Sequence, residues 1–97
     1  MLFAVIRHDK PGCFVLRQSA RPKHLEYLKA VISLIKSGGA ILDEENIQVG
    51  SILFIDVTDL SAAAAFAAAD PFVEVGLFAS TFIVPFRMVF ADGVRID

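Results

Sequence analysis

Two residues of this 97-residue chain are well suited to proton transfer, His24 and Asp70. A histidine side chain titrates near neutral pH, so it can act as a general base in water. Asp70 ends an alanine-rich stretch that is predicted to be helical, and the negative end of a helix dipole disfavours a carboxylate there. A carboxylate that accepts a hydrogen bond from one ring nitrogen of a histidine fixes the tautomer and raises the proton affinity of the other nitrogen. Together His24 and Asp70 could therefore form a general base.

Each of these residues also has a structural interpretation. Asp70 precedes Pro71, which suits the first position of a helix, so Asp70 could cap the turn that Pro71 opens. The two roles are compatible, because a carboxylate has two oxygens. His24 could instead be a partly buried histidine bonded to a backbone carbonyl, which is the commoner case for an isolated histidine on an apolar stripe. The residues alone leave these interpretations open.

Several further side chains could bind a substrate beside this pair. The planar fork of an arginine suits a substrate carboxylate, and the end of the first predicted strand and the start of the first predicted helix each supply one. A serine before that helix could donate a hydrogen bond or cap the helix, and aromatic residues could line a pocket or simply pack. Cys13 has no helix N-terminus or base nearby in sequence to activate its thiol, so a reactive role is not expected. The substrate-binding candidates are Arg7, His8, Ser19, Arg21, Tyr27 and Phe72.

The first part of the chain predicts a strand followed by a helix. Residues 2–8 form a short apolar run that ends at a Pro-Gly turn cluster. Pro22 suits the first position of a helix, which is predicted to run to Ser37 and to close at Gly38-Gly39. His24 lies on the apolar face of this helix. The residues that define this face are Leu28, Val31, Ile32 and Ile35.

The second part predicts two strands, a helix and a last strand. The helix is nearly all alanine and phenylalanine, and its small side chains allow it to lie close to a sheet. The predicted elements are strands at 40–45 and 49–57 with a turn at Glu45-Asn46, a helix at Ala62–Ala69 capped by Asp59 or Ser61, a brief helical turn ending at Gly76, and a strand at 78–90.

This β-α-β-β-α-β order predicts the ferredoxin-like α+β fold, in one domain over residues 1–97. Its sheet has four antiparallel strands with two helices on one face. Because both helices cover the same face, His24 at the start of one and Asp70 at the end of the other can lie near the same end of the sheet. The order of the elements thus allows the two residues to meet.

The last predicted strand is apolar on both faces. The chain as a whole is 56% apolar with a mean hydropathy of +0.64, whereas ordinary soluble domains are about 45–50% apolar. We therefore expect a homodimer, or a higher oligomer built from it, in which sheets pack face to face. Alternation predicts one face with Phe78, Phe82, Val84, Phe86, Met88 and Phe90, and the other with Ala79, Ile83 and Val89.

Composition and charge exclude several other classes of protein. The longest run without a charged residue, 75–86, has twelve residues and contains Pro85, whereas a membrane-spanning helix needs about 20 apolar residues. The net charge is −2 and the basic residues are scattered, which argues against nucleic-acid binding. Neither a phosphate-binding glycine loop nor a metal-spaced cluster occurs, so no cofactor and no metal are expected. A lone cysteine and the lack of a secretory signal predict a cytoplasmic protein.

Over residues 2–90 the chain resembles the YciI-like, or YCII-related, family. The resemblance implies a dimeric ferredoxin-like fold related to the dimeric α/β-barrel group. It also implies an active site centred on a histidine and an aspartate, which correspond to His24 and Asp70, and an association with elimination or lyase-type chemistry. It rests on the order and spacing of Asp9-Lys10-Pro11-Gly12, Arg21-Pro22-Lys23-His24-Leu25, Gly38-Gly39, Ala69-Asp70-Pro71-Phe72 and Val75-Gly76.

Two functions fit these observations. In the first, the chain is a small cofactor-independent enzyme of the elimination, lyase or isomerase type, in which His24 removes a proton from a small organic substrate and Asp70 orients it. In the second, the same pocket binds a small ligand or a protein partner without catalysis. The fold cannot distinguish them, because ferredoxin-like domains have many unrelated activities.

Overall fold

The computed structural model describes all 97 residues. Four strands form the main sheet, and two short strands form a separate hairpin near the C-terminus. The elements are β1 (Leu2–Asp9), α1 (Phe14–Ala30), the 3-10 turn η1 (Ile32–Leu34), β2 (Ile35–Leu42), β3 (Gln48–Asp56), α2 (Leu60–Ala68), α3 (Pro71–Glu74), β4 (Phe78–Pro85), β5 (Phe90–Ala91) and β6 (Val94–Arg95).

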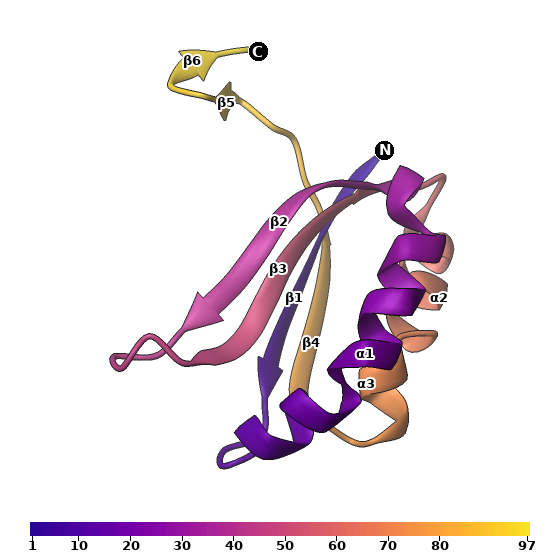
Figure 1. The fold of residues 1–97 in the computed structure, drawn as a ribbon. Coiled ribbons are helices and arrows are strands. Elements are labelled where there is room, and N and C mark those ends of the chain that lie inside the picture. Colours follow the sequence, from indigo (N-terminus) through magenta and orange to yellow (C-terminus); the bar gives the residue numbers. More distant parts are fainter.

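The main sheet is antiparallel with the strand order β2-β3-β1-β4, and the helices cover only one of its faces (Figure 1). This architecture confirms the predicted α+β, ferredoxin-like fold. β1 occupies the centre, where Val5 pairs with Leu53 on one side and Ile83 on the other. The helix-covered face and the opposite, open face of the sheet therefore have different surroundings.

The core lies between the sheet and α2. Phe3, Val5 and Ile55 project from β1 and β3 and are at most 1% exposed. The alanines of α2 let its backbone approach these residues closely, as the sequence predicted, and Phe66 fills the remaining space. Leu28 on α1 packs against this core from the side. No helix of the chain is both long and apolar enough to cross a membrane.

The first helix lies further toward the N-terminus than predicted. α1 begins at Phe14, directly after the turn in which Gly12 has a φ of +73°, and Pro22 lies inside the helix rather than at its first position. Pro22 is exposed, so water can satisfy the carbonyl group that it leaves without an N–H partner. The helix ends at Ala30, because the following residues form η1 and then pair with β3.

Gly38 and Gly39 belong to β2 and do not close a helix, contrary to the prediction. A Cβ atom added to Gly38 would lie 2.6 Å from both the Ile52 carbonyl oxygen and the Leu53 side chain. Gly38 is thus a strand glycine required by close packing. Long-range pairing with β3 overrides the local signal for a helix end, and the predicted strand over 40–45 begins at Ile35 instead.

The second half of the fold follows the prediction more closely. The Asp59 carboxylate caps α2 by accepting a hydrogen bond from the Ala62 N–H at 2.8 Å, and Gly76 ends the turn after α3 with a φ of +69°. β4 is shorter than predicted and ends at Pro85. Pro85 pairs with Phe3, and the Phe86 N–H donates to the carbonyl of Leu2, the first residue of β1, so β1 offers no further partner to the chain beyond Phe86.

A bulge in β4 separates residues that were predicted to share a face. Ser80 pairs with His8 while Phe78 pairs with Asp9, so the register shifts by one residue between these pairs. Phe78 therefore points to the helix-covered face, where its ring contacts Phe72. Phe82, in contrast, lies on the open face and is 58% exposed.

Candidate active site

Asp70 is buried at the junction of α2 and α3. Its side chain is the N-cap of α3, where Oδ1 accepts a hydrogen bond from the Phe72 N–H at 2.9 Å, as expected for an aspartate before Pro71. The residue is 3% exposed. Oδ1 and Oδ2 also lie 2.9 and 3.0 Å from Nδ1 of His24. Asp70 thus both caps α3 and lies within hydrogen-bond distance of His24, the two contacts that the sequence left open.

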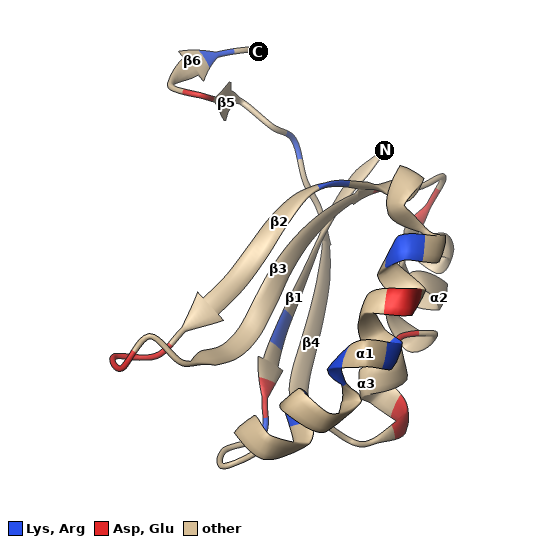
Figure 2. Cartoon of the chain, viewed as in Figure 1, with Lys and Arg blue, Asp and Glu red and all other residues tan.

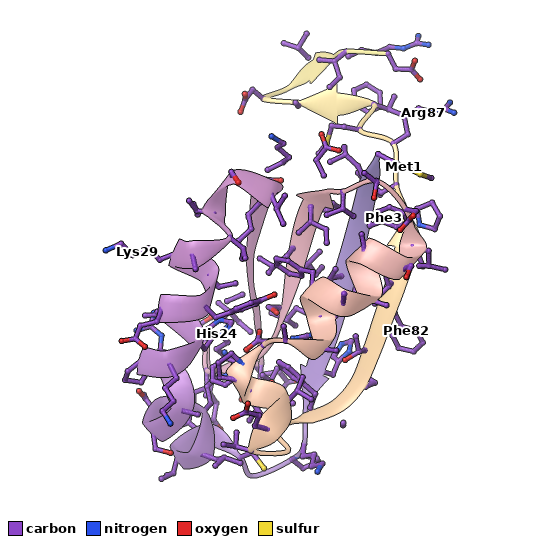
Figure 3. The ribbon with its side chains drawn as sticks, turned by 90° about the vertical axis from the view of Figure 1, so that its right-hand side faces the viewer. Met1, Phe3, His24, Lys29, Phe82 and Arg87 are labelled. Carbon is purple, nitrogen blue, oxygen red and sulfur yellow. The ribbon has the colours of Figure 1, made fainter.

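His24 lies in the middle of α1 and not at its start, because the helix begins earlier than predicted. Figure 3 shows it on the side of the helix that faces α3. Its ring stacks on Phe72, with the ring centroids 4.0 Å apart and the planes 16° from parallel. A carboxylate can only accept a hydrogen bond, so Nδ1 of His24 donates to Asp70. In the neutral ring the lone pair is then on Nε2, which makes no hydrogen bond within the chain.

Arg7, on β1, contacts Asp70 from the side of the sheet. Nη1 of Arg7 donates to Oδ2 of Asp70 at 3.1 Å, and Nη2 donates to the Ala67 carbonyl. The guanidinium also lies 4.4 Å from the ring centroid of Phe78. Burial lowers the pKa of Arg7, and the neighbouring Asp70 carboxylate opposes this effect. Both terminal nitrogens are engaged by the protein, so Arg7 lies behind the pair rather than in the position of a free substrate fork.

Arg17 is a site residue that the sequence analysis missed. It lies on α1 and makes two hydrogen bonds to Asp9, from Nε to Oδ2 at 2.7 Å and from Nη2 to Oδ1 at 2.9 Å. Its guanidinium lies 4.8 Å from the ring centroid of Phe72, and its Nη1 has no partner in the protein. Arg17 precedes His24 by seven residues, or two helical turns. This spacing would have indicated a shared face if the helix had been predicted to begin at Phe14.

These residues surround a pocket of about 200 Å³ between α1, α3 and the sheet. Its wall is apolar where Val5, Leu28 and Leu53 line it. Its polar groups converge from three directions, which is typical of a binding site for a small molecule. The polar residues that line it are Arg7, Arg17, His24, Gln48, Ser51 and Asp70.

Tyr27 lies beside this pocket and lines a different one. Its hydroxyl group donates to the Phe66 carbonyl at 2.7 Å, and burial, with a smaller contribution from Asp70, raises the pKa of Tyr27. The cleft that it lines, of about 800 Å³, lies between α1 and α2 and contains neither His24 nor Asp70. His24 and Asp70 therefore lie outside the larger cleft.

Like Tyr27, three further predicted candidates lie outside the pocket. His8 is on the open face of the sheet, with Nδ1 3.4 Å from Oγ of Ser80. Ser19 lies inside α1 rather than before it, and its hydroxyl group donates to the Leu16 carbonyl at 3.1 Å. Arg21 is exposed on the same helix and forms no ion pair. The sequence correctly placed His8 at the end of the first strand, whereas it placed Ser19 and Arg21 before or at the start of a helix that in fact begins at Phe14.

The position of Cys13 differs from the prediction. It was predicted to lie away from any helix N-terminus, but it directly precedes α1. Its sulfur contacts the Pro11 carbonyl at 3.7 Å. The difference again comes from the earlier start of the helix.

Comparison with known proteins identifies the family. A model of the YCII-related domain matches residues 1–87. An uncharacterized protein of Haemophilus influenzae is 32% identical over 98 residues, covering 93% of this chain and all of the relative, and protein YciI of Escherichia coli O6:H1 is 31% identical over the same shares.

Among solved structures, 5-chloro-2-hydroxyhydroquinone dehydrochlorinase from Burkholderia phenoliruptrix AC1100, in complex with 2,5-dihydroxybenzoquinone, superposes with a TM-score of 0.83. It is 30% identical and the match covers 90% of this chain and 94% of that one. A putative antibiotic biosynthesis monooxygenase of Bacteriodes thetaiotaomicron shares only the fold, with 13% identity, a TM-score of 0.57 and coverage of 100% and 95%. The extent of the family match and of these relatives shows that the chain belongs to the YCII-related family.

Proposed function

We propose that the chain is a small-molecule lyase that uses His24 as its general base. The observation that carries this proposal is the bonding of His24, whose Nδ1 lies against both oxygens of the buried Asp70 carboxylate while Nε2 has no partner. A carboxylate in this position orients the ring and stabilises the imidazolium that forms when Nε2 accepts a proton.

The similarity to a dehydrochlorinase suggests the substrate class, a small hydroxylated ring that carries a leaving group. Nε2 of His24 takes the proton of a ring hydroxyl group. The O–H electron pair becomes the second bond of a carbonyl, and the adjacent ring carbon, which bears the leaving group, takes a proton back from the His24 imidazolium and becomes tetrahedral. The hydroxyl group para to this carbonyl then loses its proton to Nε2, its electron pair forms a second carbonyl, the ring double bond shifts toward the tetrahedral carbon, and the leaving group departs with its bonding pair. The net change is the loss of HX, which neither oxidises nor reduces the enzyme, so the step requires no cofactor.

Arg17 is placed to stabilise the negative charge of this reaction. Its free Nη1 and its position over Phe72 put a fixed cation at the wall of the pocket, and Asp9 holds it in place. A guanidinium fixed in advance stabilises a developing phenolate without reorganisation during the reaction. The pocket of about 200 Å³ is smaller than the 300–1,000 Å³ typical of drug-sized ligands, which favours a single-ring substrate.

The proposal is tested by chloride release from a chlorinated hydroxyhydroquinone. His24→Gln should lower kcat/KM by a factor on the order of 10²–10⁴, the usual contribution of a general base. His8→Gln is the matched control, because it removes the other histidine, which lies on the opposite face of the sheet. Equal rates in wild type and His24→Gln would contradict the proposal.

The same experiment addresses the non-catalytic alternative. The wild-type protein could bind 2,5-dihydroxybenzoquinone but release no chloride from the chlorinated hydroxyhydroquinone or from related halogenated quinols. In that case the pocket is a binding site and the lyase proposal is wrong. Asp70→Asn should lower the rate less than His24→Gln, because it removes the orienting charge but leaves the base.

A further inference from the structure

We propose that Arg7 is a positioning residue that keeps His24 free of a proton in the resting protein, so that the histidine is available as a base. Arg7 acts through Asp70 and does not contact the substrate. The use of His24 as a base rests on the function proposed above, whereas the influence of Arg7 on the protonation of His24 is a property of the free protein. This influence follows from the shared contacts, the burial and the charge balance of the three side chains.

The three side chains meet at one oxygen atom. Oδ2 of Asp70 accepts a hydrogen bond from Nη1 of Arg7 at 3.1 Å and lies 3.0 Å from Nδ1 of His24. The two nitrogens are therefore no more than about 6 Å apart, a distance at which one charge strongly affects the protonation of a neighbouring group. The charge on Arg7 thus acts directly on the imidazole ring.

The cluster is shielded from water. Figure 2 shows the charged residues mainly on the helices, loops and strand ends, whereas Arg7 lies within the central strand β1. Arg7 and Asp70 are 4% and 3% exposed, and the side chain of His24 is 15% exposed. Salt and water screen charges in such a place only weakly, and an unbalanced buried charge is costly. The charge balance of the cluster therefore decides which protonation state of His24 is favoured.

Arg7 sets this balance. Burial lowers the pKa of Arg7, but the adjacent Asp70 carboxylate opposes this effect, and a guanidinium keeps its charge in proteins. Without Arg7, the charges of Asp70 and His24 would balance only when the imidazole ring carried a second proton. With Arg7 present, the guanidinium and the carboxylate already balance each other. A proton on Nε2 of His24 would then add an unbalanced positive charge, so the neutral ring is the resting state.

The other ionisable groups near His24 do not change this balance. Arg17 is the remaining charged residue that lines the pocket, and its charge is matched by the two hydrogen bonds to Asp9. Tyr27 lies one turn further along α1, and burial raises its pKa, so it stays neutral. Glu74, the acidic residue of α3, is exposed to water. The charge that His24 experiences therefore comes mainly from the Arg7–Asp70 pair.

The same balance suits the proposed reaction. When Nε2 of His24 takes the proton of a ring hydroxyl group, the cluster gains one positive charge while the substrate beside it gains one negative charge. The two new charges attract each other in a site that water does not screen, which stabilises the phenolate. Arg7 thus favours a substrate that enters the pocket neutral and becomes an anion there.

The first test is an NMR titration of His24 in the free protein. Arg7→Met leaves a pair whose charges balance only when the ring is protonated, so the midpoint of the titration should move to higher pH by about one unit or more. Arg7→Gln should move it in the same direction, and the use of two variants, each checked by circular dichroism, protects the test against a folding defect in one. Arg7→Lys keeps the charge and should restore the midpoint most of the way to the wild-type value.

Arg21→Gln is the matched control for this titration. It removes the same charge from α1, one turn before His24, but Arg21 is exposed and forms no ion pair. Water and salt screen an exposed charge, so the midpoint for His24 should stay near its wild-type value.

The second test is the pH dependence of chloride release from a chlorinated hydroxyhydroquinone. In Arg7→Met the acidic limb of kcat/KM should move to higher pH by the same amount as the titration midpoint, because this limb reports the protonation of the base in the free enzyme. A purely structural role of Arg7 would instead lower kcat/KM by the same factor at every pH.

The outcomes separate this role of Arg7 from the proposed function. Folded Arg7→Met and Arg7→Gln proteins in which His24 titrates as in the wild type would overturn the role, and so would an acidic limb that does not move. A midpoint that moves as expected in a chain that releases no chloride would support the effect of Arg7 on His24 and contradict the lyase function alone.

Discussion

On the helix-covered face of the sheet, Arg7 is 4% exposed and bonded to Asp70, whereas on the open face Phe82 is 58% exposed. Charge is thus buried where apolar residues would pack more simply, and apolar surface is exposed where polar residues would be expected. Both faces belong to the same strands, since Arg7 is flanked by Ile6 and His8, which point the other way.

Neither arrangement is explained by the stability of a single subunit. A buried ion pair contributes little net stability, because the cost of removing two charges from water offsets their attraction. An exposed aromatic residue contributes little because it is not removed from water. The proposed reaction would account for the buried charge on the covered face, and the homodimer expected from the sequence would account for the apolar open face.

The largest effect on stability is expected for Asp70→Ala. This change leaves the Arg7 charge buried without a partner and should lower the free energy of unfolding by about 3–5 kcal/mol, measured by urea denaturation. Asp59→Ala removes only a helix cap and should cost about 1 kcal/mol. A loss for Asp70→Ala no larger than for the control would show that Asp70 does not hold Arg7 in this way.

The two faces can be compared directly at neighbouring residues of β3. Ile55 is fully buried against the helices, so Ile55→Ala should cost about 2–5 kcal/mol at any protein concentration. Phe54 lies on the open face, so the homodimer expected from the sequence predicts that the cost of Phe54→Ala grows with protein concentration. Two losses that are both independent of concentration would indicate that nothing covers the open face.

Adjacent glycines of β2 provide a smaller contrast. Gly38→Ala should destabilise the chain by about 1–3 kcal/mol, because its Cβ would collide with the backbone and side chain of β3. A Cβ at Gly39 meets no atom within 4 Å, so Gly39→Ala should change the free energy of unfolding by less than about 0.5 kcal/mol at concentrations where the chain is monomeric. Thermal denaturation of dilute samples measures both, and equal costs would contradict the packing of β2 on β3.

The smallest effect concerns the chain's N-terminus. The Met1 ammonium group lies 2.6 Å from Asp56, and its hydrogen bond lowers the pKa of this carboxylate below its ordinary value. The pair therefore stabilises the fold near neutral pH, and its contribution is lost as the pH falls below about 4. As the pH falls from 5 to 2, the free energy of unfolding of the Asp56→Asn variant should decrease slightly less than that of the wild-type protein. An identical pH dependence of the unfolding midpoint would show that the pair contributes nothing.

The sequence predicted the elements more accurately than their ends. The order of the main strands and helices along the chain and the packing of the alanine-rich α2 follow from patterns that a single sequence carries. The predicted start of the first helix was wrong because an exposed Pro22 is tolerated within a helix. This error left Arg17 outside the predicted helix, so its position beside His24 was not recognised. The bulge that turns Phe78 toward the helices and the length of β4 depend on pairing with β1, which local sequence does not record.

The candidate site was predictable in part. His24 and Asp70 are chemically distinctive residues on segments that the fold brings together, so their proximity could be predicted before their distance was known. The role of Arg7 could not be predicted, because its carboxylate partner Asp70 lies 63 residues away in the sequence. Only the fold shows which face of β1 Arg7 occupies.

The central claim is that Asp70 fixes the tautomer of His24, and NMR of the imidazole nitrogens tests it directly. Long-range proton–nitrogen correlation spectra are recorded above the titration range of the ring, with His8→Gln used to assign the two histidines. The account predicts that neutral His24 has its proton on Nδ1 and that Asp70→Asn weakens this preference. A neutral His24 that carries its proton on Nε2 would contradict the account.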